Sequence, residues 1–474
     1  MSFERLWGFL AFALPALAGL LAPMSTVDLA YQLRAGDEIL LTGLIPAADT
    51  WTSTVVGAPW VDQQWGAQVV LAGVYGAGGW AGLALLRAVC IGAAFAFVAA
   101  ACRERGAGSR VAALLALVAF LLASPALALR PQLFGIVLFA ATLWLLAGRR
   151  RAPWRTWAVP VLAVLWANVH GSFVLAPLLA GWAFLEDMLE REGGARRGLL
   201  LVLATAAATV VTPFGPGAWT YAIGLSSNAT LATRVSEWQP PSLFDPVGAA
   251  FFVSVALVAV LVIGAWLGGR RLSIPAMGVL LGLAALGARA VRGIAWWPIG
   301  AAVMVASLFA SGASSAAAHE PRPTPARARR LNAIVAALLT AVGALLLATW
   351  VPADPLAGVG RISDAPAGVT RAVLAEARPE VRLYHPQRWG SWLELAVPGA
   401  RTFVDSRIEL FPDDVWADYD AMMSGSDGWE AVLERRAIDL VLVAPEDEAL
   451  AVRLPTAGWQ ERYAGPDGWV FGRP

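Results

Sequence analysis

The chain has 474 residues, of which 58% are hydrophobic and 15% charged, and its mean hydropathy is +0.62. A soluble globular protein does not carry so much apolar surface, so the composition predicts a polytopic α-helical membrane protein. All 35 basic residues are arginine, which excludes a Walker A lysine. An ordinary ATP-driven pump is therefore excluded, and ATP is not expected as a partner.

The charge is divided unevenly along the chain. Residues 351–474 contain 20 acidic side chains and 12 arginines, a net charge of −8, while the remainder carries +9. A basic membrane part followed by an acidic tail indicates two different compartments and argues against nucleic acid as a partner. The two cysteines, Cys90 and Cys102, lie in or beside one apolar run without metal-ligand spacing, and the tail has no cysteine for a disulfide framework.

Apolar runs of roughly membrane-spanning length recur along the first 350 residues. The first, Leu6 to Leu21, follows a short basic start, which is typical of a retained span and also of a secretory signal peptide. Further runs lie near 79–101, 111–128, 132–148, 156–169, 172–186, 198–213, 247–267, 273–289, 293–311 and 331–350. Together they predict about eleven transmembrane helices, of which the short fifth and sixth are expected to be kinked or tilted.

The arginines between these runs predict an orientation. If the N-terminus is cytoplasmic, all the inner loops are rich in arginine, as the positive-inside rule requires. These loops are residues 103–110, 149–155, 190–197, 269–271 and 322–330. An odd number of spans then places the C-terminal tail outside the cytoplasm, together with the long first loop.

The sequence therefore predicts three parts. Residues 1–350 form a transmembrane domain with a long first outer loop at 25–65, and residues 351–369, rich in Gly, Ala, Pro and Asp, read as a linker. Residues 370–474 are predicted to form a small extracytoplasmic α/β domain. Its expected strands are 381–384, 401–404 and 439–443, and a helix is expected over 429–436.

The first outer loop is the first place to look for chemistry, because loops of about 40 residues in compact proteins are usually functional. Asp28 lies a few residues past the first span, at the depth of a lipid headgroup phosphate, where a carboxylate can act as a general base. The alternative is a helix N-cap or a loop salt bridge. Asp49 is the second catalytic candidate and is equally suited to forming a turn. Asp37 and Asp62 are expected to be solvated.

The other candidate residues also gather on the predicted outer side. The substrate- and donor-binding candidates are Tyr31, Arg130, His170, Glu237, Trp238, Arg289 and Arg292. The arginines could hold a phosphate or pyrophosphate leaving group through charge-assisted hydrogen bonds, or could snorkel to lipid headgroups. His170 could instead be a buried, hydrogen-bonded side chain that pins a hairpin, and Glu237 a solvated loop acid. The centres of the spans are nearly free of charge.

At these residues the chain resembles a known superfamily. Asp28, Tyr31, the turn Gly43-Leu44-Ile45-Pro46, and then Trp60 and Trp65 resemble the first outer loop of GT-C fold glycosyltransferases, in the aminoarabinose-transferase and protein O-mannosyltransferase branch. The second acidic position of that pattern is Leu29 here, which departs from a two-carboxylate mechanism. In the tail, residues 389–393 (WGSWL) and 401–407 (RTFVDSR) resemble the outer domain of oligosaccharyltransferase catalytic subunits.

The resemblance implies a membrane glycosyltransferase. Such an enzyme would move a sugar from a polyprenyl-phosphate donor to a lipid, glycan or protein acceptor at the outer face of the membrane, with inversion, and Asp28 would deprotonate the acceptor. Because the closest likeness is to bacterial members, the expected location is the bacterial cytoplasmic (inner) membrane. A divalent cation, as in oligosaccharyltransferases, stays open as a cofactor; Asp28 and Asp49 could contribute to it, and its full ligand set is unassigned.

Two other classes of function remain as alternatives. One is a secondary transporter or flippase of a lipid-linked or small polar substrate, for which paired repeats and charges near the bilayer midplane are typical. The other is a non-catalytic membrane scaffold whose outer domain binds a cell-wall partner.

Overall fold

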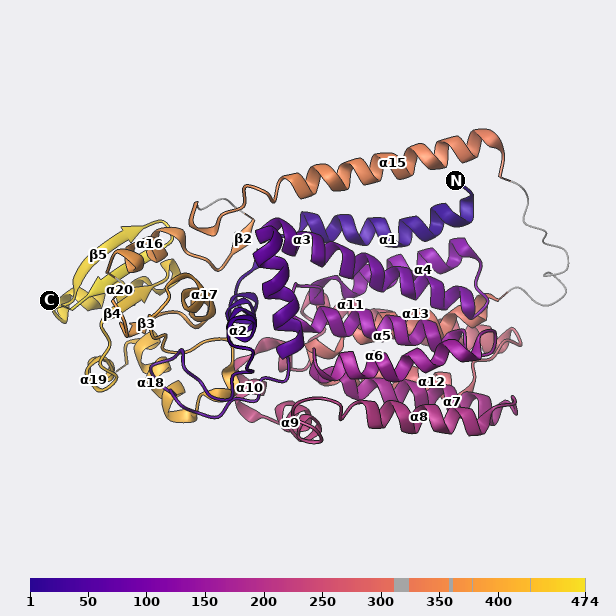
Figure 1. Ribbon diagram of the computed structural model, residues 1–474, viewed down its shortest axis with the longest axis horizontal. Helices are drawn as coiled ribbons and strands as arrows, with labels where there is room; N and C mark the ends of the chain where they lie inside the picture. Colours follow the sequence, from indigo (N-terminus) through magenta and orange to yellow (C-terminus); the bar gives the residue numbers. More distant parts are fainter. Residues whose placement is uncertain (311–323, 358–360, 377, 427, 474) are drawn as a thin grey trace. The chain divides into compact units, whose positions relative to one another are not determined.

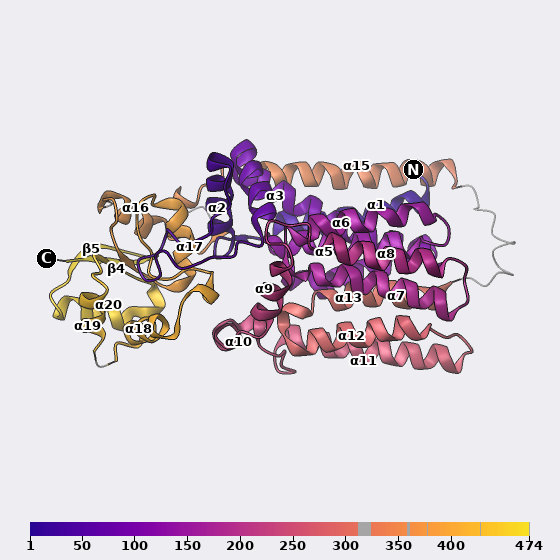
Figure 2. The same cartoon turned by 60° about the horizontal axis from the view of Figure 1, so that its bottom comes forward.

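The computed structural model describes residues 1–310, 324–357, 361–376, 378–426 and 428–473 (Figures 1 and 2). It divides into two compact units. The first, which we call the helical unit, comprises Met1–Leu21, Ala84–Ser226 and Ala232–Ala348. The second, the mixed unit, comprises Ala22–Leu83, Ser227–Leu231 and Thr349–Pro474. The predicted linker falls in the mixed unit, and its residues 358–360 lie outside the described part.

Helix α3 (Trp65–Glu104) contributes to both units. It is 40 residues long and is broken at Gly79, whose φ of 56° and ψ of −148° are not helical. A positive φ of this kind carries no steric penalty for glycine, which lacks a Cβ. The predicted span at 79–101 therefore begins at this break, and the 14 residues before it, of which 66–78 had no predicted element, are helical.

The helical unit consists of α-helices joined by short 3₁₀ segments. Its α-helices are α1 (Phe3–Leu21), α4 (Ser109–Ala123), α5 (Pro131–Ala147), α6 (Ala158–Ala167), α7 (Leu175–Leu189), α8 (Ala195–Ala208), α9 (Gly217–Ser226), α11 (Pro246–Leu267), α12 (Ile274–Arg289), α13 (Trp296–Val305) and α15 (Ala326–Ala348), with α10 (Ala229–Arg234) at the boundary of the units. Its 3₁₀ segments are η1 (Ser124–Ala126), η2 (Pro153–Trp157), η3 (Gly171–Val174), η4 (Ser236–Trp238), η5 (Val291–Gly293) and η6 (Ala306–Phe309).

Among the described residues, seven helices are long and apolar enough to cross a membrane. They are Phe3–Leu21, Trp65–Glu104, Ser109–Ala126, Gly171–Leu189, Pro246–Leu267, Val291–Phe309 and Ala326–Ala348. Helices α5 and α12 are apolar but shorter. The spans predicted at 156–169 and 198–213 correspond to α6 and α8, which have 10 and 14 residues and fall short of about 20. The chain is thus a helical protein with several candidate spans, and the count of eleven remains a prediction; residue 311, the end of one predicted span, is outside the described residues.

Helix α13 forms the centre of the helical unit. All ten of its residues are buried, and it packs against α4, α5, α11 and α12. A helix that is apolar on every side is stable only when it is surrounded, which explains this position. Helix α15 is the opposite case: it lies beside α1 (Figure 1) and exposes Leu331, Leu338 and Leu345, as expected for a helix that faces lipid.

A buried group of ion pairs fastens several helices of this unit at one end. Glu186 of α7 accepts from Arg105, just beyond α3, at 2.8 and 3.1 Å, and from Arg149, just beyond α5, at 2.8 Å. It also accepts from the hydroxyl of Ser273, the N-cap of α12, at 2.5 Å. Because Glu186 is 1% exposed, these bonds supply the compensation that a buried charge requires.

The mixed unit contains a four-stranded sheet in the order β3-β4-β6-β5. Strand β3 (Leu383–Tyr384) is parallel to β4 (Leu440–Val443), while β6 (Gly468–Gly472) is antiparallel to both β4 and β5 (Gln460–Gly465). Its helices are α16 (Ala367–Glu376), α17 (Gln387–Ala396), α18 (Asp413–Ser424), α19 (Trp429–Arg435) and α20 (Glu448–Thr456), with 3₁₀ segments η7 (Pro355–Ala357), η8 (Ile408–Leu410) and η9 (Pro445–Asp447). The predicted strands at 381–384 and 439–443 and the helix at 429–436 are present, whereas 401–404 forms only isolated bridges.

The stretch predicted as one long outer loop is partly helical, so that prediction is wrong for a third of its length. Helix α2 (Leu29–Thr42) occupies it and ends at Gly43 in the left-handed conformation, with the Gly43 N–H bonded to the carbonyl of Ile39. One face of α2 is buried at positions spaced by three and four residues, including Leu29, Leu33 and Ile39. This spacing was visible in the sequence.

The same stretch pairs with the C-terminal part of the chain. Strand β1 (Met24–Ser25) is parallel to β2 (Ile362–Ser363), with Met24 opposite Ile362. Farther along, Thr52 forms a parallel bridge with Thr402. Residues 22–83 and the tail therefore build one structural unit, although about 270 residues of other structure separate them in the sequence.

Candidate functional site

In the helical unit, Arg130 stands at the N-terminus of α5. It is the N-cap residue, and the following Pro131 keeps its backbone extended, with φ of −153° and ψ of 168°. Its Nη1 lies 2.8 Å from Oε2 of Glu237 in η4, and the Arg130 side chain is 10% exposed. The arginine is thus held at a fixed position by the proline and by an ion pair.

Arg292 and Trp238 lie beside this pair. The Arg292 guanidinium carbon is 5.2 Å from the centroid of the Trp238 ring, a cation–π distance. Two hydrogen bonds fix the segment that carries Arg292: the Val291 N–H donates to the Gln239 carbonyl at 3.0 Å, and Nε2 of Gln132 donates to the Arg292 carbonyl at 3.3 Å. Segments η4, η5 and the start of α5 therefore meet at one place.

The two arginines also set the charge state of Glu237. Burial would raise the pKa of Glu237, but Arg130, and then Arg292, hold that pKa below its usual range. Glu237 is therefore an ionised carboxylate facing two guanidinium groups. The expectation that it is a simple solvated loop acid is not supported by this environment.

An apolar cavity of about 200 Å³ opens at these arginines. Apart from Arg130, Arg292 and Glu237, every residue that lines it is apolar. The apolar residues come from the end of α4, η1, α11, η5 and the link between η5 and α13: Leu122, Ala123, Pro125, Ala126, Val247, Val291, Ile294 and Ala295. A hydrocarbon pocket with two cations at its edge suits an amphiphile with an anionic head.

His170 caps the short segment η3 near these arginines. Its Nδ1 accepts from the Ser172 N–H at 3.1 Å, so the ring proton of the neutral imidazole is on Nε2. Burial, followed by the charges of Arg292 and Arg130, keeps the pKa of His170 well below its usual value. Ser172 Oγ also accepts from the Trp166 indole at 2.9 Å. This matches the pinned-hairpin alternative, and the imidazole additionally offers a neutral N–H donor.

Arg289 does not join this group. It is exposed in the last turn of α12, where its Nη2 donates to the Ser226 carbonyl at 3.3 Å. A cation at the C-terminal end of a helix is favourable because of the helix dipole. Of the sequence-predicted residues in the helical unit, Arg130, His170, Glu237, Trp238 and Arg292 are thus brought together, and Arg289 is not.

In the mixed unit, Asp28 occupies the N-cap position of α2. Its backbone is helical, with φ of −92° and ψ of −31°, and its side chain makes no capping hydrogen bond. The N-cap alternative is therefore not supported. Three residues on, the hydroxyl of Tyr31 accepts from Nε2 of Gln32 at 2.5 Å, and its ring packs against the buried cluster of Trp51 and Trp60.

Asp49 lies at the centre of a buried ion-pair network. Its Oδ1 accepts from Nη2 of Arg407 at 2.6 Å, and its Oδ2 accepts from the Thr52 N–H and hydroxyl at 3.1 and 2.7 Å. Oδ2 of Asp405 accepts from Nε of the same guanidinium at 2.9 Å and shares its Nη2 with Asp49. Because Asp49 is 0% exposed and fully engaged, this geometry favours a structural role over the predicted catalytic one.

Two tryptophans and a glutamate complete this network. The Arg407 guanidinium carbon lies 4.4 Å from the ring centroid of Trp51 and 4.6 Å from that of Trp60. Glu394 of α17 accepts from the Thr402 hydroxyl at 2.8 Å. Burial, and then the neighbouring Asp405, raise the pKa of Glu394 well above its usual value. The two tail stretches that resemble oligosaccharyltransferases, residues 389–393 and 401–407, therefore fold around the first outer segment.

The fit of a divalent cation was tested against these contacts. Asp49 is committed to Arg407 and Thr52, so it does not fit as a partner of Asp28 in a metal site. Within the described ranges, no three His, Cys, Asp or Glu side chains come together in a way that would hold a metal ion. Asp28 and Asp49 therefore do not fit as the ligands of a divalent cation.

Three residues correct or extend the sequence interpretation. Asp62, expected to be solvated, is 2% exposed. Arg87, in the membrane-length part of α3, is also 2% exposed, so the spans contain more buried charge than composition indicated. Gln132 donates a hydrogen bond to the backbone carbonyl of Arg292. In the sequence, only its position directly after Arg130-Pro131 pointed to this role. Asp37 is exposed, as predicted.

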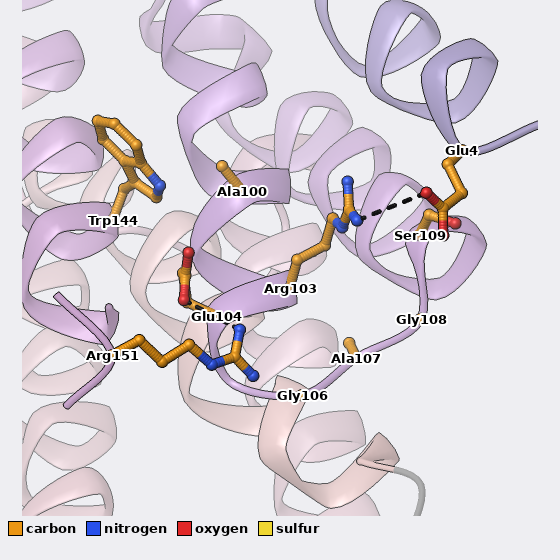
Figure 3. A pocket seen from close by; sticks show the side chains of 10 residues that line it. All are labelled: Glu4, Ala100, Arg103, Glu104, Gly106, Ala107, Gly108, Ser109, Trp144 and Arg151. Atoms are coloured by element: carbon orange, nitrogen blue, oxygen red, sulfur yellow. Dashed lines mark hydrogen bonds and ion pairs between the residues drawn. The ribbon is translucent and has the colours of Figure 1, made fainter. Parts of the chain in front are cut away.

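Figure 3 shows a larger cavity of about 540 Å³ in the helical unit, between the start of α1 and the ends of α3 and α5. Its charged side chains pair with one another: Arg103 lies 4.0 Å from Glu4, and Arg151 lies 3.1 Å from Glu104. At least one side chain of each pair is more than half exposed, so these ion pairs contribute little to stability. The balanced charges provide no preference for an anion, so this cavity is not the candidate site.

Comparisons with known proteins give a clear result for the fold. No protein-family model and no curated protein matches the sequence. Among solved structures, the oligosaccharyltransferase of Archaeoglobus fulgidus tethered to an acceptor peptide with the NVT sequon matches with a TM-score of 0.60 and 13% identity, over 100% of this chain and 74% of that chain. Its apo form matches with a TM-score of 0.59, and its complex with an inhibitory peptide and a dolichol-phosphate matches with 0.60, each over 75% of that chain. The chain therefore has the GT-C glycosyltransferase fold of this archaeal oligosaccharyltransferase.

Proposed function

We propose that the chain is a membrane glycosyltransferase that takes a sugar from a polyprenyl-phosphate donor. The observation that supports this most directly is the pairing of Arg130 and Arg292 at the edge of an apolar cavity of about 200 Å³. A polyprenyl phosphate has the matching chemistry, because it joins a hydrocarbon chain to an anionic head. The dolichol-phosphate bound to the archaeal oligosaccharyltransferase is a molecule of this class.

The roles of individual residues follow from their chemistry. The guanidinium groups of Arg130 and Arg292 would neutralise the phosphate as it leaves the anomeric carbon, which is where charge develops. The neutral Nε2–H of His170 and the Trp238 ring would add a donor and a stacking surface. Asp28 would take the proton from the acceptor hydroxyl or amine, with inversion at the anomeric carbon. The acceptor would be a lipid, a glycan or a protein.

The proposal includes the orientation expected from the arginines. Eleven spans with a cytoplasmic N-terminus would place the mixed unit outside the bacterial cytoplasmic membrane, where lipid-linked sugars are consumed. A reporter-fusion map supports this if fusions after residue 351 are active only outside the cytoplasm. A cytoplasmic tail would contradict it.

The deciding experiment is a transfer assay on membranes with a radiolabelled polyprenyl-phosphate sugar, comparing wild type with Asp28→Asn. We expect Asp28→Asn to lose at least about 100-fold in turnover, the usual scale for a general base. Asp37→Asn is the matched control, since it removes an exposed carboxylate from the same helix. Full activity of a stably inserted Asp28→Asn protein would remove the catalytic role from Asp28.

A further inference from the structure

Asp62 is a buried acid for which the proposed reaction has no use. It lies between Trp60 and the start of α3 and is 2% exposed. Its Oδ1 accepts from Nε2 of Gln68, which is in the first part of α3, at 2.6 Å. Gln68 is itself 0% exposed, so both side chains lie fully inside the mixed unit.

Each member of this pair has an oxygen that lacks a hydrogen bond. Within the described residues, Asp62 Oδ2 and Gln68 Oε1 are both buried and have no partner. Both atoms are acceptors when Asp62 is a carboxylate, so neither can satisfy the other. Buried acceptors without donors are costly and rare, and two on one bonded pair require an explanation.

One proton supplies what both atoms lack. A carboxylic acid and a primary carboxamide are complementary, because the amide N–H donates to one acid oxygen and the acid O–H donates to the amide oxygen. We propose that Asp62 is held as a neutral carboxylic acid whose hydroxyl donates to the Gln68 carboxamide, and that ionisation of Asp62 opens this pair. This proposal does not depend on the proposed function.

The charges that face Asp62 agree with this state. Burial raises the pKa of Asp62 from 3.8 to about 7, against the lowering effects of the Gln68 hydrogen bond and of Arg407, while Glu38 of α2 raises it further. Arg407 is the cation whose charge acts on Asp62, but Asp49 and Asp405 already share it. An ionised Asp62 would thus add a further negative charge to a region whose guanidinium is already matched.

The acid–amide pair lies where two helices approach most closely. A Cβ added to Gly36 of α2 would be 2.1 Å from the Gln68 carbonyl oxygen, so the two backbones are in contact at this point. One turn earlier on α2, Nε2 of Gln32 donates to Oε1 of Gln64, the residue just before α3, at 2.9 Å. Helix α2 begins directly after Asp28, so opening the pair would loosen the packing of the helix that carries the proposed base. The pair is therefore a proton-dependent latch.

The first test is infrared difference spectroscopy on the full-length protein in detergent, titrated through neutral pH. Wild type should show a protonated carboxyl C=O band that disappears with a midpoint near the pKa of about 7. Asp62→Asn should abolish the band and Asp37→Asn should keep it. Gln68→Met should move the band to higher frequency, because the C=O loses its N–H donor. Glu394 is a second buried acid with a raised pKa, so a carboxyl band common to wild type and Asp62→Asn belongs to Glu394. The proposal would be overturned if wild type lacked a band that titrates near neutral pH, or if that titrating band had the same amplitude in Asp62→Asn.

Thermal unfolding provides a second, independent readout. The folded pKa of Asp62 is raised, so its contribution to stability is complete below about pH 4 and is lost as the pH rises toward about 7. Asparagine reproduces the neutral acid, with Nδ2 donating to Gln68. We expect Asp62→Asn to equal wild type at about pH 4 and to unfold several degrees higher above about pH 7. Equal midpoints across this range would count against the latch.

Discussion

Nη2 of Arg407 donates to Oδ1 of Asp49 at 2.6 Å, although 358 positions separate the two residues in the sequence. Both side chains are at most 2% exposed, and Trp51 and Trp60 cover the guanidinium. Asp49, in the segment after the first membrane helix, therefore has its hydrogen-bonded cation in the tail. This relationship predicts how the first outer segment responds to substitution.

Replacing Asp49 should destabilise the protein rather than stop its chemistry selectively. Asp49→Asn leaves Arg407 without one of its two bonded carboxylates, and breaking a buried ion pair costs about 3–5 kcal/mol. Asp37→Asn, an exposed acid, should change stability by less than about 0.5 kcal/mol. Thermal unfolding in detergent measures both. If Asp49→Asn is as stable as Asp37→Asn but inactive, the catalytic prediction for Asp49 would be restored.

The close approach of α2 and α3 predicts a strong effect of one methyl group. Gly36→Ala places a Cβ against the Gln68 carbonyl and should cost about 1–3 kcal/mol through overpacking. Gly73→Ala in α3 meets nothing within 4 Å and should be neutral or stabilising by up to about 1 kcal/mol. The comparison of thermal midpoints checks this. Equal midpoints for the two variants would show that the helices separate easily.

The two central arginines should control affinity for a lipid phosphate. Arg292→Met removes a charged donor, and charged hydrogen bonds contribute about 1.5–3 kcal/mol, so affinity should fall roughly 10- to 100-fold. Arg289→Met, three residues earlier and exposed, is the matched control and should have little effect. Isothermal titration calorimetry with a short-chain polyprenyl phosphate measures the affinity of each variant. Equal losses in both variants would place the phosphate elsewhere.

Glu237 should compete with the donor for Arg130. The carboxylate lies 2.8 Å from this arginine, so it occupies the position that a phosphate oxygen would take. Glu237→Gln removes the competing charge, and we expect affinity for the polyprenyl phosphate to rise about 2- to 5-fold, the scale of a partly exposed ion pair. A large loss of affinity would show that Glu237 supports the phosphate site instead.

His170 should not ionise during turnover near neutral pH. Its pKa is lowered in the folded protein, so the unfolded chain binds the extra proton first, and its contribution to stability is lost as the pH falls below about 6.5. The pH profile of transfer activity near pH 6.5 should therefore have the same shape in wild type and in His170→Gln. The pH profiles of the two proteins test this. A transition near that pH in wild type alone would mean that His170 carries charge in the reaction.

The sequence predicted the helical class, the gathering of five polar residues and the α/β character of the tail. The helical membrane class is confirmed, because hydropathy is a local signal, while the site residues and the extracytoplasmic domain stay predictions. The lengths of α6 and α8 could not be predicted from hydropathy, because an apolar run does not show at which residue a helix begins. The apolar cavity beside Arg130 and Arg292 also depends on residues from four separate segments.

Two acids of the first outer segment show what a local signal misses. Asp62 was expected to be solvated, but it is buried and accepts a hydrogen bond from Gln68, six residues later. Asp49, a catalytic candidate, is buried against Arg407, and a partner 358 positions away leaves no periodic trace in a single sequence. The 3.6-residue spacing of Leu29, Leu33 and Ile39 was a local signal for α2, and it was outweighed by the polar residues around it.

The mixed unit is built from segments that are far apart in the chain, and this sets the order in which its parts are synthesised. Residues 22–83 are made first, and the segment that begins at Thr349 follows some 270 residues later. At roughly 5–20 residues per second, Asp49 waits on the order of tens of seconds before Arg407 exists. During this interval the Asp49 carboxylate lacks the guanidinium that it pairs with in the folded protein, so the buried ion-pair network can form only after the tail has been made.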